Sequence, residues 1–292
     1  MQVGVIFPQT EIGADPGVLR AYAAAIEELG YAHILSYDHV LGADPAGHPG
    51  WSGPYDVDDA FHEPFVLYGY LAAITTVELV TGVLILPQRQ TALVAKQAAE
   101  VDLLTGGRFR LGVGLGWNAV EYAALGKEFT DRGRRSEEQV ALLRRLWTEP
   151  SVTFDGRYES VVAAGIAPMP VQRPIPVWFG GSSPAALRRA GRIADGWFPE
   201  TRPGPALDEA IATVHGAATG AGRDPAALGM EGRVGVSRGI DVAAEQIDAW
   251  RGYGATHVSV STMGFGATAV DGHIAALADV ARAIGLRPRE VS

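Results

Sequence analysis

Short apolar runs alternate with stretches of helical periodicity along almost the whole chain. Eight runs are apolar enough to be buried strands, at residues 3–7, 32–37, 78–86, 109–114, 176–180, 195–198, 231–236 and 256–261. Between them, apolar side chains recur every three or four residues, which predicts helices at 16–29, 63–76, 91–105, 131–148, 183–194, 205–219, 242–253 and 270–284. Two helices open with a capping residue before a proline, at Asp15-Pro16 and Ser183-Pro184.

Eight consecutive strand–helix units predict a parallel α/β architecture. Strands that are apolar on both faces are typical of parallel sheets covered by helices. We expect a closed (β/α)8 barrel, a TIM barrel, in which residues 1–292 form one domain. An open doubly wound sheet is the alternative that the same pattern permits.

Two segments interrupt the repeating pattern and are expected to be insertions after strands 2 and 4. Residues 40–61 are more apolar than a free linker, since they contain Trp51, Tyr55 and Phe61. We interpret them as a lid or binding loop, with disorder as the alternative. In the second insertion, residues 150–175, the run Val152-Thr-Phe-Asp-Gly-Arg-Tyr158 predicts a hairpin turned at Asp155-Gly156, with a role in packing or dimer contact.

Composition narrows the class of protein. The net charge of −9 and the lack of a basic cluster argue against nucleic acid or an anionic membrane as partner. No apolar run approaches the ~18 residues of a membrane span, and no charged leader precedes Val3-Gly-Val-Ile-Phe7. The absence of cysteine excludes disulfides and thiol chemistry. We expect a soluble cytoplasmic enzyme whose partner is a small-molecule substrate.

The segment from Arg108 to Tyr122 is the most informative local feature. A buried strand runs into a loop with glycine at 112, 114 and 116. A residue without Cβ lets the backbone approach another backbone or a flat ring, and such loops bind ligands at the C-terminal ends of barrel strands. The dinucleotide fingerprint would need glycine where Trp117 stands, so binding of nicotinamide in the Rossmann manner is not expected. Gly114 and Gly116 thus predict a flat or phosphorylated ligand; tight strand-to-helix packing is the alternative.

A second glycine-rich turn joins strand 5 to the helix that follows. It reads Val177-Trp-Phe-Gly180-Gly181-Ser182-Ser183-Pro184. Free N–H groups and the dipole at a helix N-terminus favour an anion, so this turn is the candidate phosphate site. A plain N-cap at Ser183 is the alternative, and many barrels bind phosphate after strands 7 and 8 instead.

A carboxylate and an imidazole follow strand 2 in Leu35-Ser-Tyr-Asp38-His39. Imidazole groups titrate near neutral pH, which makes His39 a candidate general acid or base and Asp38 a candidate contact to a cofactor ring. A capping and turn pair is the alternative. Glycine at position 82, inside strand 3, is explained most simply by a bulge that lets the barrel curve.

Two other chemistries find little support. The run Gly235-Val-Ser-Arg-Gly239 matches a serine-hydrolase elbow, but its partner would be His257, at the start of strand 8 and so at the wrong end of a barrel. The histidines at 48, 62, 215 and 273 show no paired metal spacing, so no metal site is predicted.

In this order, the segments resemble the luciferase-like monooxygenase superfamily and, within it, the bacterial branch that uses the deazaflavin coenzyme F420. The resemblance covers nearly the whole chain. It rests on Ser36-Tyr-Asp-His39, Thr81-Gly-Val-Leu-Ile-Leu-Pro87, the run from Ala95 to Trp117, Arg132-Gly-Arg with Glu137-Glu138, Leu146-Trp147, Pro176-Val-Trp-Phe-Gly-Gly-Ser182 and Ala194-Asp-Gly-Trp197.

The resemblance implies a homodimeric barrel with the cofactor ring at its C-terminal mouth. A non-prolyl cis peptide at Gly82–Val83 would back the ring, Asp38 and His39 would lie near the deazaflavin, and its phosphate would bind to Gly180, Gly181 and Ser182. In the sugar-phosphate dehydrogenases of this branch, a glutamate that donates a proton follows the glycine loop, where this chain has Trp117. Oxidation of glucose 6-phosphate is therefore not expected, and His39 is left as the proton donor or acceptor.

We therefore expect hydride transfer between C5 of coenzyme F420 and a small, apolar organic substrate. His39 would be the catalytic residue, and Trp51 and Trp117 would shape the substrate pocket. One alternative is a monooxygenase dependent on flavin mononucleotide (FMN), because both cofactors share a tricyclic ring and a ribityl phosphate. The other is a barrel that binds the cofactor without turnover.

Overall fold

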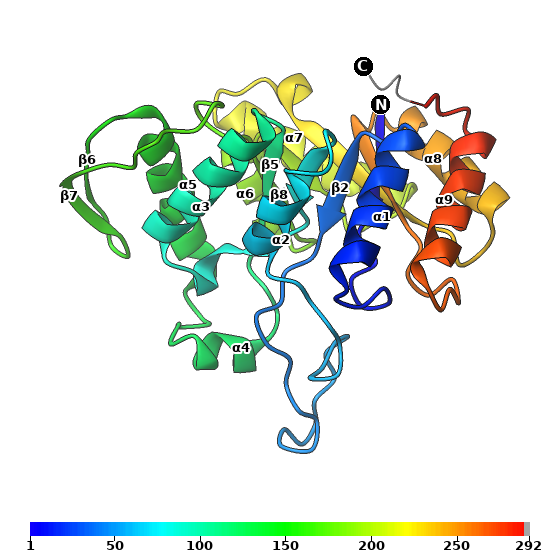
Figure 1. Ribbon diagram of the computed structural model, residues 1–292. Helices are drawn as coiled ribbons and strands as arrows, with labels where there is room; N and C mark the ends of the chain where they lie inside the picture. Colours follow the sequence, from blue (N-terminus) through cyan, green and yellow to red (C-terminus); the bar gives the residue numbers. More distant parts are fainter. Residues whose placement is uncertain (289–292) are drawn as a thin grey trace.

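The predicted apolar runs form parallel strands that pair around a closed barrel in the computed structural model, which describes residues 1–288 (Figure 1). The sheet has the order β3-β2-β1-β11-β10-β9-β8-β5-β4, and β3 also pairs with β5, which closes it. Because β3 and β4 occupy the same position in the barrel, the nine strands fill eight positions. The predicted (β/α)8 barrel is therefore confirmed, and the alternative prediction of an open doubly wound sheet is wrong. The strands are β1 (Gln2–Ile6), β2 (His33–Ser36), β3 (Glu78–Thr81), β4 (Leu84–Ile85), β5 (Phe109–Gly114), β8 (Val177–Gly180), β9 (Gly196–Phe198), β10 (Gly229–Gly235) and β11 (His257–Ser261).

Helices surround the barrel, and their buried faces pack on the strands. Asp15 accepts hydrogen bonds from the amides of Gly17 and Val18 and so fixes the start of α1, while Gly106, at φ 65°, ends α3. Within residues 1–288, no helix has the length and apolar character needed to cross a membrane. The helices are α1 (Pro16–Glu28), α2 (Pro64–Leu71), α3 (Thr91–Thr105), α4 (Ala119–Ala124), α5 (Arg132–Thr148), α6 (Pro184–Ile193), α7 (Pro205–Gly220), α8 (Ile240–Gly252) and α9 (Val270–Ala283), with 3-10 turns at Leu86–Gln88 and Pro225–Ala227.

The third strand departs from its prediction. Residues 78–86 were expected to be continuous, but the strand is broken at Gly82–Val83, whose peptide bond is cis as the family resemblance implied. A Cβ on Gly82 would lie 2.3 Å from Cδ2 of Leu35, a residue that is fully buried inside the barrel. The glycine therefore serves close packing at a break in the strand. Pairing with β5 shifts by one residue across this break, from Val80 opposite Arg110 to Leu84 opposite Val113, which agrees with the predicted bulge.

The two insertions lie in different places. Residues 40–61 extend beyond the C-terminal ends of the strands, at the same end as α4 (Figure 1). Residues 150–175 contain an antiparallel hairpin of β6 (Val152–Asp155) and β7 (Ser160–Ala164). Asp155 pairs with Ser160, so the turn is formed by residues 156–159, slightly beyond the predicted position. The carboxylate of Glu138 on α5 accepts hydrogen bonds from backbone amides of this turn and fixes the hairpin to the helix.

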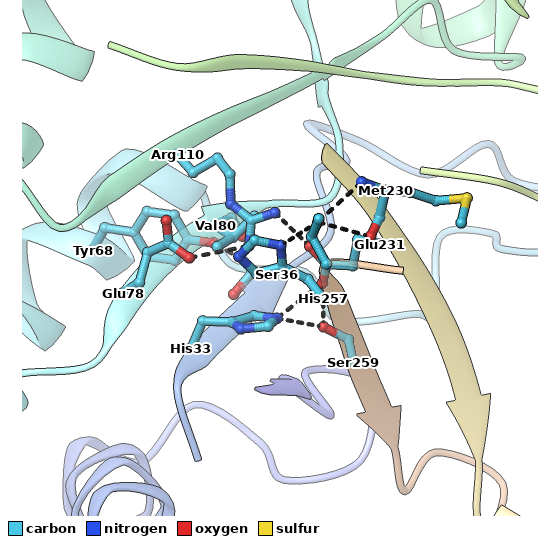
Figure 2. Close-up of polar contacts among 11 residues, drawn as sticks. His33, Ser36, Tyr68, Glu78, Val80, Arg110, Met230, Glu231, His257 and Ser259 are labelled. Carbon is cyan, nitrogen blue, oxygen red and sulfur yellow. Dashed lines mark hydrogen bonds and ion pairs between the residues drawn. The ribbon is translucent and has the colours of Figure 1, made fainter. Parts of the chain in front are cut away.

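Charged side chains fill the interior of the barrel near the N-terminal ends of its strands (Figure 2). Glu231 is central: one carboxylate oxygen lies 2.9 Å from Nε2 of His33 and the other accepts from Nη1 of Arg110 at 2.6 Å. Arg110 also reaches Glu78 at 3.0 Å, and Ser259 contacts both His33 and Glu231. We call these five residues the floor cluster.

Electrostatics hold the floor cluster together. Burial acts to raise the pKa of Glu231, but Arg110 and His33 outweigh it and hold that pKa well below its usual range. The Arg110 guanidinium also stacks 4.2 Å from the ring centroid of Trp178. Apolar side chains then fill the interior next to the cluster: Ile6, Leu35, Val80, Trp178 and Phe198. The N-terminal end is thereby closed, so a ligand must enter from the opposite end.

Candidate functional site

A cavity of about 480 Å³ opens at the C-terminal ends of the barrel strands. We call it the mouth cavity. It brings together most of the residues that the sequence marked as candidates, from four different segments of the chain. Those that line it are Asp38, His39, Gly82, Val83, Gly114, Gly116, Trp117, Gly180, Gly181 and Ser182.

The side chain of Val83 accounts for the glycines of the wall. A Cβ on Gly114 would lie 2.3 Å from Cγ2 of Val83, and one on Gly180 would lie 2.9 Å from Cγ1. Gly116 has φ 68°, and a Cβ there would lie 2.8 Å from Cγ2 of Ile85. Close packing, the alternative explanation in the sequence analysis, therefore accounts in part for glycine at these positions. Its effect is a smooth wall on which Val83 presents an apolar surface to a ligand.

Asp38 supports this wall from behind. Its Oδ2 accepts a hydrogen bond of 2.9 Å from the amide of Ile85, and its Oδ1 accepts one of 2.7 Å from Arg89. Burial raises the pKa of Asp38 above its ordinary value, although Arg89 and the Ile85 amide favour the charged form. Because both oxygens already have partners, Asp38 fixes the segment after the Gly82–Val83 peptide more directly than it offers a free group to a ligand.

The turn after β8 has the features of an anion site. Within the described part of the chain, the amides of Gly181, Ser182 and Ser183 have no protein acceptor, and they precede α6. Gly181 has φ 137°, a conformation that side chains disfavour. The Ser183 hydroxyl accepts a hydrogen bond from the amide of Ala186, so the predicted N-cap exists beside these free donors. Three amides and the hydroxyl of Ser182 are thus available to a phosphate.

His39 is held by a carboxylate that the sequence did not reveal. Its Nδ1 lies 3.6 Å from Oε2 of Glu121, a residue of α4 whose side chain is 1% exposed. The same carboxylate accepts hydrogen bonds from Gln88 and from the backbone amide of Val40. Burial acts to raise the pKa of Glu121, but its contacts with His39, Gln88 and Val40 lower it below the ordinary value.

This arrangement determines which nitrogen of His39 is free. Since Nδ1 faces the buried Glu121, Nε2 is the atom available to a ligand. The rings of Phe61, Tyr55 and Trp117 surround the imidazole, with centroids 4.7, 5.4 and 5.5 Å away. His39 is therefore oriented on one side by a charge and shielded on the others by aromatic side chains.

A local signal for Glu121 existed in the sequence. Asn118 and Glu121 have the spacing of a capping box, and the Asn118 side chain does accept a hydrogen bond from the Glu121 amide. The pattern indicates a helix start, which is where the six-residue helix α4 lies. The Glu121 side chain, however, reaches residues 39 and 40 instead of its own helix terminus. Only the fold could show that.

The two tryptophans proposed for the substrate pocket have different positions. Trp117 lines the mouth cavity, but Trp51 does not. Trp51 lines a second cavity of about 500 Å³ under residues 48–54, where its ring centroid lies 5.5 Å from that of Trp117. Trp51 thus supports the outer face of Trp117.

Several residues that sequence reasoning missed also line the mouth cavity. Arg132 stacks on Phe129, with its guanidinium 3.7 Å from the ring centroid. The others are Tyr37, Tyr55, Glu200 and Arg233. Tyr37 and Arg132 belong to runs that carry the family resemblance, and Tyr55 belongs to the predicted lid, but nothing local assigned these side chains to the site. Glu200 and Arg233 stand in segments without a motif.

The serine-hydrolase alternative does not match the geometry of the barrel. Ser237 follows the C-terminal end of β10, whereas His257 begins β11 beside the floor cluster, so the two lie at opposite ends of the barrel. Within residues 1–288, no group of three or more histidine or acidic side chains is arranged to hold a metal ion.

The amino-acid sequence is similar to those of known enzymes. The F420-dependent glucose-6-phosphate dehydrogenase of Amycolatopsis mediterranei is 34% identical over 191 residues, 63% of this chain and 53% of that protein. The FMNH(2)-dependent dimethylsulfone monooxygenase of Pseudomonas putida is 36% identical over 148 residues, 49% of this chain and 40% of that protein. The matched segments thus span only about half the length of these relatives.

A solved structure agrees on the fold. The coenzyme F420-dependent tetrahydromethanopterin reductase of Methanopyrus kandleri superposes with a TM-score of 0.76 at 15% identity, covering 97% of this chain and 98% of that one. The sequence profile of the luciferase-like monooxygenases, Bac_luciferase, matches residues 1–289. The chain therefore belongs to the luciferase-like monooxygenase family, in which its relatives include both F420-dependent and FMN-dependent enzymes.

Proposed function

We propose that this protein is an F420-dependent oxidoreductase that transfers a hydride between C5 of the deazaflavin and a small organic substrate. One observation carries the proposal. A single cavity contains the apolar wall at Val83, the free amides of residues 181–183 and the imidazole of His39. These are respectively a surface for a flat ring, a site for a phosphate and a group that can move a proton.

The residues present fit such a cofactor. A Cβ at Gly114 or Gly180 would collide with Val83, so the wall is built to be flat where a ring would pack. Gly181, Ser182 and Ser183 would hold the phosphate, and the dipole of α6 would favour its charge. When bound, the deazaflavin supplies the two-electron hydride chemistry that no side chain of this protein provides.

His39 would supply the proton that accompanies hydride transfer. In the direction of substrate reduction, Nε2 donates a proton to the substrate oxygen or carbon; in oxidation, it accepts one. Glu121 holds the other nitrogen and stabilises the protonated imidazole. The aromatic side chains around His39 exclude water from the site.

Two observations favour F420 as the cofactor: the similarity to the Amycolatopsis dehydrogenase, which extends over 63% of this chain, and the order of the motifs along the sequence. An FMN-dependent monooxygenase is the second candidate, because a monooxygenase of Pseudomonas putida is as similar over a shorter segment. The ring and the ribityl phosphate common to the two cofactors would occupy the same wall and the same amides.

Fluorescence titrations with oxidised F420 and, separately, with FMN test the proposal directly. We expect saturable binding of F420 that is at least tenfold tighter than that of FMN, about 1.4 kcal/mol. Tighter binding of FMN would replace the proposal with the monooxygenase, and binding of neither would refute both.

The variant His39→Asn separates an enzyme from a passive carrier of the cofactor. Asparagine keeps polarity near Glu121 but cannot move a proton. We expect turnover to fall by ~10²–10⁴-fold while the affinity for F420 changes little. A carrier would show no turnover in either protein.

We also propose that the chain forms a homodimer through α2 and α3. Val66 on α2 is 74% exposed and Leu93 on α3 is 52% exposed, and the two helices are adjacent (Figure 1). Exposed apolar side chains on neighbouring helices are typical of subunit interfaces. Sedimentation equilibrium of the parent protein should give twice the mass of one chain. The double variant Val66→Glu/Leu93→Glu should give the mass of one chain. A parent protein that is monomeric would refute this interface.

A further inference from the structure

Strand β10 carries a second charged residue inside the barrel, one layer above the floor. Side chains alternate along a strand, so Glu231 and Arg233 point to the same side. That side is the interior, because Glu231 belongs to the floor cluster and a Cβ on the intervening Gly232 would meet Trp250 of α8. Arg233 accordingly lines the mouth cavity.

The position of Arg233 relative to the cofactor wall follows from the sheet order. Starting at β3, the strand β10 is the fourth neighbour in either direction around the closed barrel. Arg233 therefore lies across the mouth from the Gly82–Val83 wall. If the cofactor ring packs on Val83, Arg233 faces the side from which a substrate must approach.

Unlike the arginine below it, Arg233 has no partner among the described residues. In the floor cluster, Arg110 is paired with two carboxylates. Within residues 1–288, the Arg233 side chain makes no salt bridge or hydrogen bond, although it is half-buried. A guanidinium held part-way into a cavity without a counter-charge is ready to bind an anion.

A second space adjoins the mouth cavity at this arginine. It has a volume of about 400 Å³, and it shares Tyr37, Glu200 and Arg233 with the mouth cavity. Arg202 lies on its rim. A substrate can therefore extend from the cofactor wall past Arg233. Glu200 faces the same space, which disfavours a doubly charged group such as a phosphate ester and leaves room for a single negative charge near Arg233.

We propose that Arg233 binds a carboxylate of the substrate and thereby presents the reacting carbon to the cofactor wall. This inference deepens the proposed function, on which its assignment to a substrate rests, and it replaces the expected apolar substrate with a carboxylic acid. Tyr37 and Tyr55 line the same cavity and offer phenolic hydroxyls to the second oxygen. Burial raises the pKa of Tyr55, so its hydroxyl stays protonated as a donor.

Ligand binding can test this without turnover. Benzoate and benzamide have nearly the same shape and differ in charge, and both can be titrated calorimetrically into the protein as purified. We expect benzoate to bind about tenfold or more tightly than benzamide, because a charge-assisted pair with arginine is stronger than a neutral hydrogen bond. Equal affinities, or a preference for benzamide, would overturn the inference.

Four variants locate the charge. Arg233→Gln should abolish the preference for benzoate, and Arg233→Lys should retain part of it. Arg202→Gln, which removes an equal charge from the rim, should leave the preference unchanged, and Glu200→Gln should increase it. If Arg202→Gln abolishes the preference while Arg233→Gln does not, the anion binds at the rim and the inference is wrong.

A parallel titration separates this inference from the proposed function. Arg233→Gln should bind F420 with the affinity of the parent protein, because Arg233 lies across the mouth from the wall and two strands away from the phosphate turn. Loss of F420 binding in Arg233→Gln with an unchanged preference for benzoate would assign Arg233 to the cofactor and refute the inference. A benzoate preference that depends on Arg233 in a protein that binds no F420 would support the anion site and refute the proposed cofactor instead.

Discussion

The two ends of the barrel use polar residues in opposite ways. At the N-terminal end, the charged groups of the floor cluster contact one another, and Glu231 and Arg110 are almost completely buried (Figure 2). At the mouth, the amides of residues 181–183 and the guanidinium of Arg233 have no protein partner among the described residues. Both sets are fixed by strands of the same sheet. The pairing of a group is thus a better guide to its role than its burial or its charge.

Asp38 and Glu121 refine this comparison, because they lie at the mouth but are paired. Each uses its carboxylate to hold a neighbour, Arg89 and Ile85 in one case and His39 in the other. Like the carboxylates of the floor cluster, they are paired, but among the groups that they hold in position, Ile85 and His39 line the mouth cavity. A paired charge near a cavity therefore indicates support, and an unpaired one indicates contact with a ligand.

Removing a charge from the floor should have the largest effect on stability. In Arg110→Met, Glu231 and Glu78 lose their shared partner, and removal of one member of a buried ion pair costs about 3–5 kcal/mol. Urea unfolding followed by circular dichroism measures the loss. The double variant Arg110→Met/Glu231→Gln should recover part of it, which also reports on folding if the single variant is too unstable to study.

An exposed pair provides the matched control for this experiment. Arg145 on α5 and Glu149, the residue that follows this helix, make two hydrogen bonds of 2.7 Å, but both side chains are about 40% exposed. Arg145→Met should leave the unfolding midpoint almost unchanged. Equal effects of the two substitutions would show that burial does not distinguish the floor from the surface.

At the mouth, adding one methyl group should be the next most damaging change. In Gly114→Ala, the new Cβ would overlap Cγ2 of Val83, so we expect a loss of ~1–3 kcal/mol in stability and weaker cofactor binding. The double variant Gly114→Ala/Val83→Ala removes the overlap and should restore stability. Thermal unfolding and F420 titration report the two effects separately.

Gly216 in α7 is the control for that substitution, since a Cβ there would meet nothing within 4 Å. Gly216→Ala should stabilise the protein by ~0.5–1 kcal/mol, because alanine favours a helix over glycine. A comparable loss from both alanines would contradict a specific role for the contact with Val83.

The smallest effect that we predict is the contribution of His257, at the edge of the floor cluster, to the pH dependence of stability. Burial, aided by the nearby Arg110, lowers the pKa of His257 to about 3. The unfolded chain has a histidine pKa of about 6.5, so as pH falls below that value the unfolded state takes up a proton that the folded state refuses. Stability from this group is therefore present above about pH 6.5 and declines as pH falls toward 3.

Since His257 is only partly buried, solvent screening reduces the effect to on the order of 1 kcal/mol between pH 7 and 5. Urea midpoints of the parent and His257→Gln across this range give the difference. If both proteins lose stability equally, His257 does not contribute to the pH dependence of the floor.

The strands could be predicted from sequence because their apolar runs are long and repeat regularly. The break at Gly82–Val83 could not, since residues 78–86 are continuously apolar and only the resemblance to known proteins indicated a cis bond. Helix α4 was missed because six residues are too few to show a helical period. Local composition thus determines where elements lie better than where they are interrupted.

For the site, sequence analysis found the groups that belong to motifs and missed those that depend on distant contacts. The glycines and His39 stand in recognisable runs. Glu121 contacts residue 39, which belongs to another segment, and Arg233 stands out only because the closed barrel places it across from residue 83. Trp51 illustrates the reverse error: it was expected to shape the substrate pocket, and the fold placed it behind Trp117 instead of in the mouth cavity.

Strand β10 has a consequence for protein engineering. Because Glu231 is bound in the floor cluster, the strand cannot slip by a residue without turning that carboxylate out of the barrel. The depth of position 233 is therefore constant whatever side chain it carries. A library randomised at this one codon would present head groups of different charge and length at a fixed height above the floor cluster, and so would change the lining of the mouth cavity without redesign of the scaffold.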